Sequence, residues 1–204
     1  MSDQKPADIG LRREPRTFAS IDAEFVSAFR NLGSADLSDA MHQSGSMDTA
    51  IQALHPPASR IIGPALTVAV PSGANEVRRA AIEMTQPGDV LVIAGRGNPL
   101  WAMLGDKLAS ILMAHGVAGV VIDGLARDAD AIGRLGLPVW CRGRATSAGP
   151  KQGPGEINVP VACGGVVVNP GDLIVADADG VVVVPRDAAR AIAGVATERA
   201  AEAI

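Results

Sequence analysis

Residues 116–128 read Gly-Val-Ala-Gly-Val-Val-Ile-Asp-Gly-Leu-Ala-Arg-Asp. The first part of this segment, up to Asp123, is apolar at successive positions, which is typical of a central strand that is buried on both faces of a parallel sheet. In open α/β sheets, ligands bind beyond the carboxyl ends of the strands. Arg127 and Asp128, which follow this strand, therefore lie where a functional site is expected.

Strand and helix patterns alternate on both sides of this segment. The expected strands are Ile61–Val70, Val90–Ala94, Val117–Asp123 and Leu137–Arg142, and the expected intervening helices are Ala74–Met84, Gly105–His115 and Ala129–Leu135. Such alternation predicts the α/β class, with a mainly parallel sheet layered against helices.

The two ends of the chain differ from this middle part in composition and periodicity. Residues 1–17 are polar and aperiodic, so we expect an N-terminal arm there, followed by helices over Ile21–Asn31 and from Ser34 onward. Beyond Gly149, runs rich in Gly, Pro and Val predict short antiparallel strands. The Ala-rich tail, residues 187–204, predicts a C-terminal helix.

Composition limits the class of protein. The chain has 204 residues, 48% hydrophobic and only 2% aromatic, which suits one domain, residues 1–204, with an aliphatic core. Its net charge of −4 offers no basic face for nucleic acid. There is no apolar run of roughly 20 residues that could span a membrane. We expect a cytoplasmic protein that binds neither nucleic acid nor membrane.

Several common sites are not indicated. Cys141 and Cys163 form no CxxC pair and stand near no histidine with zinc-site spacing, so both are expected to be buried. Gly95-Arg-Gly97 lacks the third glycine of a dinucleotide fingerprint, and no P-loop occurs. Asp172, Asp177 and Asp179 fit hairpin turns better than a calcium loop.

Arg127 and Asp128 allow two interpretations. Asp128 could cap the helix Ala129–Leu135, and Arg127 could form an ordinary surface ion pair. Alternatively, a hard carboxylate oxygen beside a guanidinium could hold Mg²⁺ or Mn²⁺ next to a 2-oxo acid. Periodicity alone leaves both interpretations open.

A second candidate site is the expected helix start at Gly105, Asp106, Lys107 and Leu108. The first amides of a helix lack intrahelical partners and carry partial positive charge, so they can hold a carboxylate. Gly105 would let such a ligand approach the backbone closely. Asp106 could instead be a surface residue that the helix dipole favours.

Taken together, these residues resemble the family of 4-hydroxy-4-methyl-2-oxoglutarate aldolases and regulators of ribonuclease activity A (RraA-like). The most specific element is an aspartate, twenty intervening residues and then Arg-Asp, which Asp106 and Arg127-Asp128 match. Supporting segments are Leu37-Ser-Asp-Ala40, Gly63-Pro-Ala65 and residues 171–185. The resemblance implies a layered α/β sandwich that is related to swivelling phosphohistidine domains.

The resemblance also implies a role for each site residue. Asp128 would be the single direct protein ligand of Mg²⁺ or Mn²⁺. Arg127 would contact the substrate and stabilise the enolate, and Asp106 would hold metal-bound waters and position a proton carrier. The backbone of Gly105, Asp106, Lys107 and Leu108 would bind the substrate carboxylate.

By resemblance, the chain would be a metal-dependent class II pyruvate aldolase that cleaves 4-hydroxy-4-methyl-2-oxoglutarate or a similar 4-hydroxy-2-oxo acid to pyruvate and a second oxo acid. Oxaloacetate decarboxylase activity would accompany this cleavage, since both reactions pass through a metal-stabilised pyruvate enolate. The alternative is a non-catalytic regulator that binds a ribonuclease or an RNA helicase. The sequence has no glycine-rich loop after a first strand that could hold S-adenosylmethionine, so a methyltransferase is not indicated.

The family implies a homotrimer or a dimer of trimers with sites between subunits. Glu198 or Glu202 would then reach a neighbouring site from the C-terminal helix, although an ordinary helix surface explains each equally well. Pro99 and Trp101, before the carboxylate-binding turn, have no counterpart in the family pattern.

Overall fold

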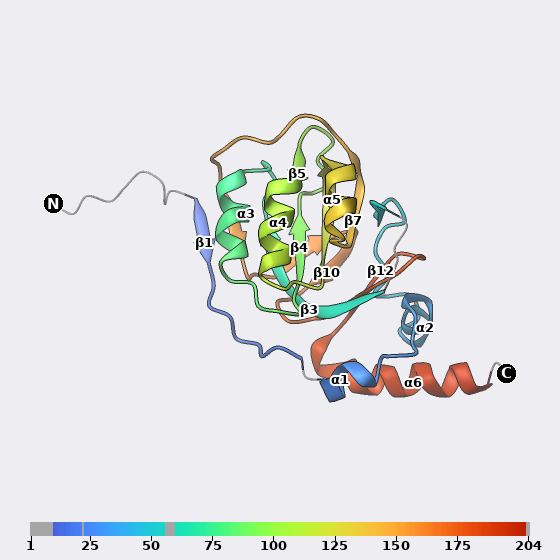
Figure 1. The fold of residues 1–204 in the computed structure, drawn as a ribbon. Helices are drawn as coiled ribbons and strands as arrows, with labels where there is room; N and C mark the ends of the chain where they lie inside the picture. Colours follow the sequence, from blue (N-terminus) through green and yellow to red (C-terminus); the bar gives the residue numbers. More distant parts are fainter. Residues whose placement is uncertain (1–9, 22, 56–59, 203–204) are drawn as a thin grey trace.

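The computed structural model describes residues 10–21, 23–55 and 60–202 and is built around a mixed β-sheet (Figure 1). The strand order along the sheet is β1-β8-β3-β4-β6-β7-β2. These strands are β1 (Leu11–Arg13), β2 (Gln52–Ala53), β3 (Ile61–Ala69), β4 (Val90–Ala94), β6 (Gly119–Ala126), β7 (Val139–Arg144) and β8 (Gly155–Ile157). The strands β5 (Ala102–Leu104), β11 (Leu173–Ala176) and β12 (Val181–Val184) extend it, and β9 (Val161–Cys163) pairs with β10 (Val166–Val168).

The middle of this sheet is parallel, as the alternating sequence pattern predicts. β3, β4, β6 and β7 run in the same direction, and the antiparallel pairs β2 with β7, β8 with β3, and β11 with β3 lie around them. The helices α3 (Asn75–Ile82), α4 (Asp106–Ala114) and α5 (Ala129–Leu135) stand side by side over the parallel strands (Figure 1). The predicted α/β class is confirmed.

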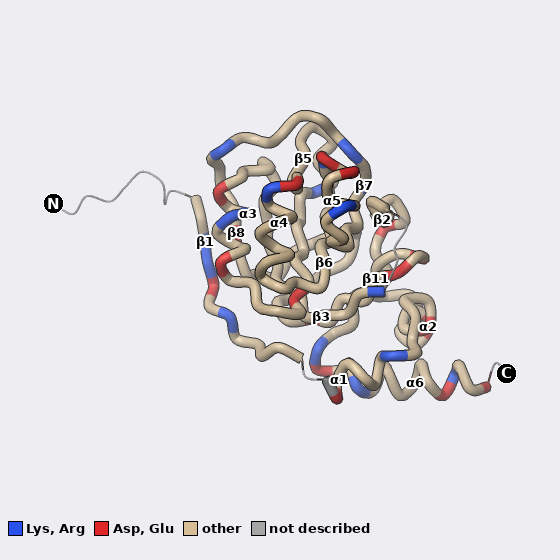
Figure 2. Tube along the Cα trace, viewed as in Figure 1, with Lys and Arg blue, Asp and Glu red and all other residues tan. Residues whose placement is uncertain are grey.

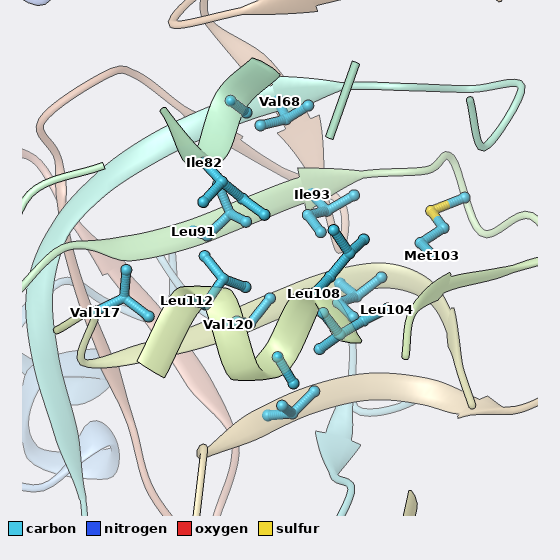
Figure 3. Packing of buried hydrophobic residues seen from close by; sticks show 14 of the residues in the cluster. Val68, Ile82, Leu91, Ile93, Met103, Leu104, Leu108, Leu112, Val117 and Val120 are labelled. Carbon is cyan, nitrogen blue, oxygen red and sulfur yellow. The ribbon is translucent and has the colours of Figure 1, made fainter. Parts of the chain in front are cut away.

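Alternating side chains of the parallel strands form two apolar layers. Leu91 and Ile93 of β4 pack toward the helices, among the leucines of α4, as Figure 3 shows. Val90 and Val92 of the same strand face the opposite layer, because successive strand residues point to opposite faces. Burying one such Leu or Ile side chain completely stabilises the fold by about 1.5–3 kcal/mol.

A third apolar cluster joins the chain ends to the hairpin β11–β12. The helices α1 (Ala23–Ser27), α2 (Ser34–Ala40) and α6 (Ala189–Glu202) lie on this side of the molecule. Asp177 connects the hairpin turn to α2, because its carboxylate accepts hydrogen bonds from the Ser34 amide at 2.7 Å and hydroxyl at 2.6 Å. The Asp179 amide also donates to Asp177 Oδ1 at 3.1 Å, so both aspartates lie in the predicted turn between the antiparallel strands β11 and β12.

The N-terminal segment is more ordered than its aperiodic sequence suggests. Leu11–Arg13 forms β1, which pairs in parallel with β8. Arg16 then donates two hydrogen bonds, of 2.6 and 2.9 Å, to the buried carboxylate of Asp89. Partners more than seventy residues away in sequence thus hold the part of the arm after residue 9.

The predicted helix Ile21–Asn31 is wrong in length, because the described helix covers only Ala23–Ser27. The Arg60 guanidinium hydrogen-bonds to the carbonyls of Phe29, Arg30 and Leu32, which satisfies this backbone in a turn conformation without a continued helix. At the other end, a 3₁₀ turn over Arg186–Ala188 precedes α6, and the last two residues of the expected helix, 203 and 204, lie outside the described residues.

Cys141 and Cys163 are both free and buried, as expected from the sequence. Burial raises the pKa of Cys163 to about 12 and also raises the pKa of Cys141. The thiolate is the reactive form, and an unfolded cysteine ionises with a pKa of about 8.5. Both thiols should therefore resist Ellman's reagent in the native protein at pH 8 and react at once in denaturant. Rapid reaction of the native protein would contradict the buried placement.

Within the described part of the chain, no helix is both long and apolar enough to cross a lipid bilayer.

Candidate functional site

The two candidate segments of the sequence come together at the end of the parallel sheet. β5 pairs in parallel with β6, with Leu104 opposite Ala126, and the Arg127 amide donates a 2.8 Å hydrogen bond to the Leu104 carbonyl. The chain after β5 turns into α4, and the chain after β6 turns into α5. The start of α4 and the Arg127-Asp128 pair are thus neighbours at the carboxyl ends of two adjacent strands, where ligands of such sheets bind.

Asp128 occupies the N-cap position of α5, but its side chain does not cap that helix. Its backbone has a left-handed conformation (φ 56°), which an aspartate tolerates better than most residues. The carboxylate is turned toward α4 instead: Oδ2 accepts a hydrogen bond from the Asp106 amide at 3.3 Å and lies 3.3 Å from Nε of Arg127. The helix-cap interpretation of Asp128 is therefore wrong, and its carboxylate faces the start of α4.

Gly105 makes this approach possible. A Cβ atom added at Gly105 would lie 2.7 Å from Oδ2 of Asp128 and 3.1 Å from Nε of Arg127. The backbone of Gly105 is extended (φ −138°), a conformation open to any residue, so the requirement for glycine comes from space alone. The structure places the Asp128 and Arg127 side chains against this backbone, where the sequence analysis expects a ligand carboxylate.

Carboxylates engage the first amides of α4. Asp106 Oδ1 accepts a 2.7 Å hydrogen bond from the Lys107 amide, while Asp128 Oδ2 accepts one from the Asp106 amide. This arrangement follows from the unpaired amides and partial positive charge of a helix N-terminus. Leu108 points its side chain into the core, so any ligand contact from it would use the backbone.

A cavity of about 270 Å³ opens beside these residues. Its lining includes Gly105, Asp106, Lys107, Leu108 and Arg127. The side chains of Arg127 and Asp128 are 39% and 35% exposed, so a solute can reach both. Figure 2 shows basic and acidic positions next to each other where α4 begins.

Sequence reasoning missed another part of the cavity wall. α3 contributes Asn75, Arg78 and Arg79, and the segment after β7 contributes Ala148, Gly149 and Lys151. Arg78 was detectable in principle, because it lies on the apolar face of α3 between Val77 and Ala81, where a charged residue is unusual. The segment after β7 gave no comparable signal, since the isolated bridge between Ala148 and Ala102 is a tertiary contact.

Glu198 and Glu202 do not join this site within the same chain. Both lie on α6, at the opposite end of the molecule from β5 and the start of α4 (Figure 1). Trp101 directly precedes Ala102, which lines the cavity, and a Cβ atom added on Gly73, in the turn before α3, would lie 3.5 Å from it. Pro99 belongs to the loop before β5, where the Leu100 amide donates to Asn98 Oδ1 at 2.8 Å.

The donors available for a metal ion are few but chemically suitable. The described residues contain no group of three or more His, Cys, Asp or Glu side chains that could hold a metal. Asp128 and Asp106 each bring a carboxylate to the first amides of α4, and carboxylate oxygens are the ligand type that Mg²⁺ and Mn²⁺ prefer. Mg²⁺ often keeps several waters and uses only one or two carboxylates, so this donor set fits such an ion.

Comparisons with known proteins agree with this architecture. Residues 34–183 match the family model RraA-like, described as Aldolase/RraA. The chain is 41% identical, over 80% of its length and 77% of the relative's, to the "Putative 4-hydroxy-4-methyl-2-oxoglutarate aldolase" of Halalkalibacterium halodurans.

Solved structures give the same result. Streptomyces coelicolor RraAS2, described as an unusual member of the RNase ES inhibitor RraA protein family, superposes with a TM-score of 0.79 at 34% identity, covering 89% of this chain and 94% of that one. A protein of Geobacillus kaustophilus described as an S-adenosylmethionine:2-dimethylmenaquinone methyltransferase reaches a TM-score of 0.70 at 37% identity, covering 76% and 96%. The family match, the sequence relatives and the fold agree with one another, and the chain belongs to the RraA-like family.

Proposed function

We propose that this protein is a divalent-metal-dependent pyruvate aldolase that cleaves 4-hydroxy-4-methyl-2-oxoglutarate or a similar 4-hydroxy-2-oxo acid, and that it also decarboxylates oxaloacetate. The observation that carries the proposal is that Asp106 and Arg127 line one cavity, while the Asp128 carboxylate contacts the Asp106 amide and the Arg127 guanidinium. Relatives that are named as aldolases support it.

Asp128 is the proposed direct ligand of Mg²⁺ or Mn²⁺, with Asp106 binding waters of the same ion. When bound, the ion would supply Lewis-acid polarisation of the substrate's keto oxygen. The exposed Asp128 carboxylate, held toward α4 by an amide and a guanidinium, supports this role. The few protein donors leave room for water, for substrate and for a carboxylate from a neighbouring subunit, such as Glu198 or Glu202 of a trimer.

Arg127 is the proposed stabiliser of negative charge. Cleavage of the bond between C3 and C4 leaves an electron pair on C3, which becomes pyruvate enolate. The 4-hydroxyl gives its proton to the water that Asp106 would hold and becomes the carbonyl of the second oxo acid. A guanidinium at the enolate oxygen lowers this barrier because it opposes the charge that develops in the transition state. Asp106 would hold the water that carries the proton to C3.

The first turn of α4 is the proposed seat of the pyruvyl carboxylate. Its amides already attract carboxylates, since Asp106 and Asp128 occupy two of them. A substrate carboxylate could accept the hydrogen bond of the Lys107 amide once the Asp106 side chain releases this amide and turns toward the water that it is proposed to hold. This exchange would place Asp106 in its proton-transfer position only when substrate is bound.

A second candidate function is regulation of a ribonuclease, which the likeness to Streptomyces coelicolor RraAS2 favours. A purely regulatory protein would have no use for a metal ligand beside an arginine at an open cavity. The aldolase proposal is the stronger one because it accounts for this group of side chains.

Pyruvate release from a panel of oxo acids tests the proposal. Purified protein with Mg²⁺ or Mn²⁺ should release pyruvate from 4-hydroxy-4-methyl-2-oxoglutarate and from oxaloacetate, and a chelator should stop both reactions. Lactate dehydrogenase coupled to NADH oxidation measures the rate. If no 4-hydroxy-2-oxo acid gives metal-dependent turnover while a ribonuclease is inhibited by the protein, the regulatory function replaces the catalytic one.

A further inference from the structure

Asp128 holds an uncommon backbone conformation at the junction between β6 and α5. Its φ of 56° lies in the left-handed region, which a non-glycine residue keeps only where neighbouring groups over-determine it. Before this residue, the Arg127 amide donates to the Leu104 carbonyl at 2.8 Å. After it, the Asp128 carbonyl accepts a 3.0 Å hydrogen bond from the Ile132 amide. The direction of the Asp128 carboxylate therefore depends on how firmly this junction is held.

The side chain of His55 reaches the junction from a distant part of the chain. Nε2 of His55 lies 2.7 Å from the carbonyl oxygen of Ala129, the residue that follows Asp128. A carbonyl group only accepts hydrogen bonds, so Nε2 must carry the proton and donate. The start of α5 is thus anchored by an imidazole that lies seventy-four residues before Ala129 in the sequence.

His55 follows a segment that is bonded to the sheet. β2 pairs with β7, and the Leu54 amide donates to the Val139 carbonyl of β7 at 2.8 Å. Nη2 of Arg144, also in β7, donates to the Leu54 carbonyl at 2.8 Å. Both backbone polar groups of the residue before His55 are therefore bonded to β7, so that His55 links the position of α5 to the edge of the sheet.

The glycine at position 133 makes room for the imidazole on α5. A Cβ atom added at Gly133 would lie 2.9 Å from both Cε1 and Nε2 of His55, too close for the ring to stay in place. Gly133 lies within α5, where glycine is less favourable than alanine. Its exposure excludes core packing as the reason for its small size. The contact with His55 accounts for an otherwise unfavourable residue in this helix.

We propose that His55 is a positioning residue: its hydrogen bond to Ala129, made possible by the space at Gly133, keeps Asp128 in the left-handed conformation that turns its carboxylate toward α4. The expected effect on turnover rests on the proposed aldolase function. His55 is not among the residues that line the cavity, so it acts on the reaction through the backbone of α5.

Two substitutions of His55 separate its hydrogen bond from its packing. His55→Phe keeps a ring against Gly133 but has no donor. It should lower kcat by about tenfold to a hundredfold, because a misplacement of roughly 1 Å in a reacting group can slow a reaction a hundredfold. His55→Gln carries an amide that can donate from nearly the same position as Nε2, and it should retain most of the rate. Equal losses in the two variants would overturn the proposal.

Gly133→Ala disturbs the same contact from the side of the helix. The added Cβ should push the imidazole away and lower kcat to the level of His55→Phe. The thermal midpoint should change little, since the helix preference of alanine offsets the lost hydrogen bond. In a His55→Ala background the same substitution meets no ring and should leave kcat unchanged. Additive losses would show that Gly133 acts independently of His55, which contradicts the proposal.

An NMR measurement that needs no turnover separates this inference from the aldolase function. The Asp106 amide donates to Oδ2 of Asp128 at 3.3 Å, and a hydrogen bond to a carboxylate moves an amide proton downfield. This resonance should move upfield in His55→Phe and in Gly133→Ala, and should stay in place in His55→Gln. Arg134→Gln, an exposed change on the next residue of α5, is the matched control and should alter neither the resonance nor kcat.

The outcomes of this measurement are distinct. An unmoved Asp106 resonance in His55→Phe and Gly133→Ala would refute the role of His55, whatever the rates are. The expected movements, in a protein whose wild-type form turns over no oxo acid, would support the role of His55 and refute only the aldolase function.

Discussion

Asp128→Asn is expected to reduce metal-dependent pyruvate release by about a hundredfold to a thousandfold or more, the range seen when a key electrostatic group is removed. Asparagine tolerates the left-handed backbone that residue 128 adopts, so the protein should fold normally. The change removes only the charge that would hold the cation. The effect should therefore be specific to metal binding and turnover.

Two measurements check this expectation. The coupled pyruvate assay gives the loss of rate, and isothermal titration calorimetry with Mn²⁺ gives the loss of metal affinity. Asp130→Asn is the matched control, because Asp130 is an exposed carboxylate in the first turn of the same helix. If Asp128→Asn keeps both its activity and its Mn²⁺ affinity, Asp128 is not the metal ligand.

Gly105→Ala is expected to lower kcat by about a hundredfold, because a misplacement of roughly 1 Å in a reacting group has an effect of that size. The added Cβ would stand 2.7 Å from Oδ2 of Asp128 and 3.1 Å from Nε of Arg127, so one or both of these side chains must move. The extended backbone at Gly105 accepts alanine without strain. Stability should change little while activity falls.

The comparison that isolates this effect is Gly194→Ala, where an added Cβ meets nothing within 4 Å. That variant should keep full activity. Circular dichroism and thermal melts would establish that Gly105→Ala remains folded, and the pyruvate assay would measure its activity. An active Gly105→Ala protein would show that catalysis does not depend on the close approach of Asp128 and Arg127 to the start of α4.

Much of the layered architecture follows from local pattern. The apolar run before Asp123 predicts a central strand, and the structure buries it on both faces as β6. The helices α3, α4 and α5 lie within two residues of where periodicity places them. Burial of an apolar face is a local requirement, so the order of residues alone can reveal it.

The candidate site was only partly predictable. Resemblance to a family singled out Asp106, Arg127 and Asp128, whereas the rules for helix caps favoured a purely structural Asp128. The amide of Asp106, twenty-two residues earlier in the chain, offers the Asp128 carboxylate a different donor. The Asp106 amide thus competes with the first amides of α5 for the Asp128 carboxylate. No local rule could predict this competition, because β5, the strand that brings the Asp106 amide there, is only three residues long.

The sequence by itself therefore determined the α/β class, the central parallel strands and the identity of the residues that carry charge near their ends. Tertiary structure alone decided that β1 pairs with β8, that Asp128 turns from α5 toward α4, and that Arg78 enters the cavity wall without a carboxylate partner among the described residues. The physical reason is range: hydrophobic periodicity is a property of neighbours in the chain, whereas hydrogen-bond partners and charge balance depend on which distant segments the packed sheet brings together.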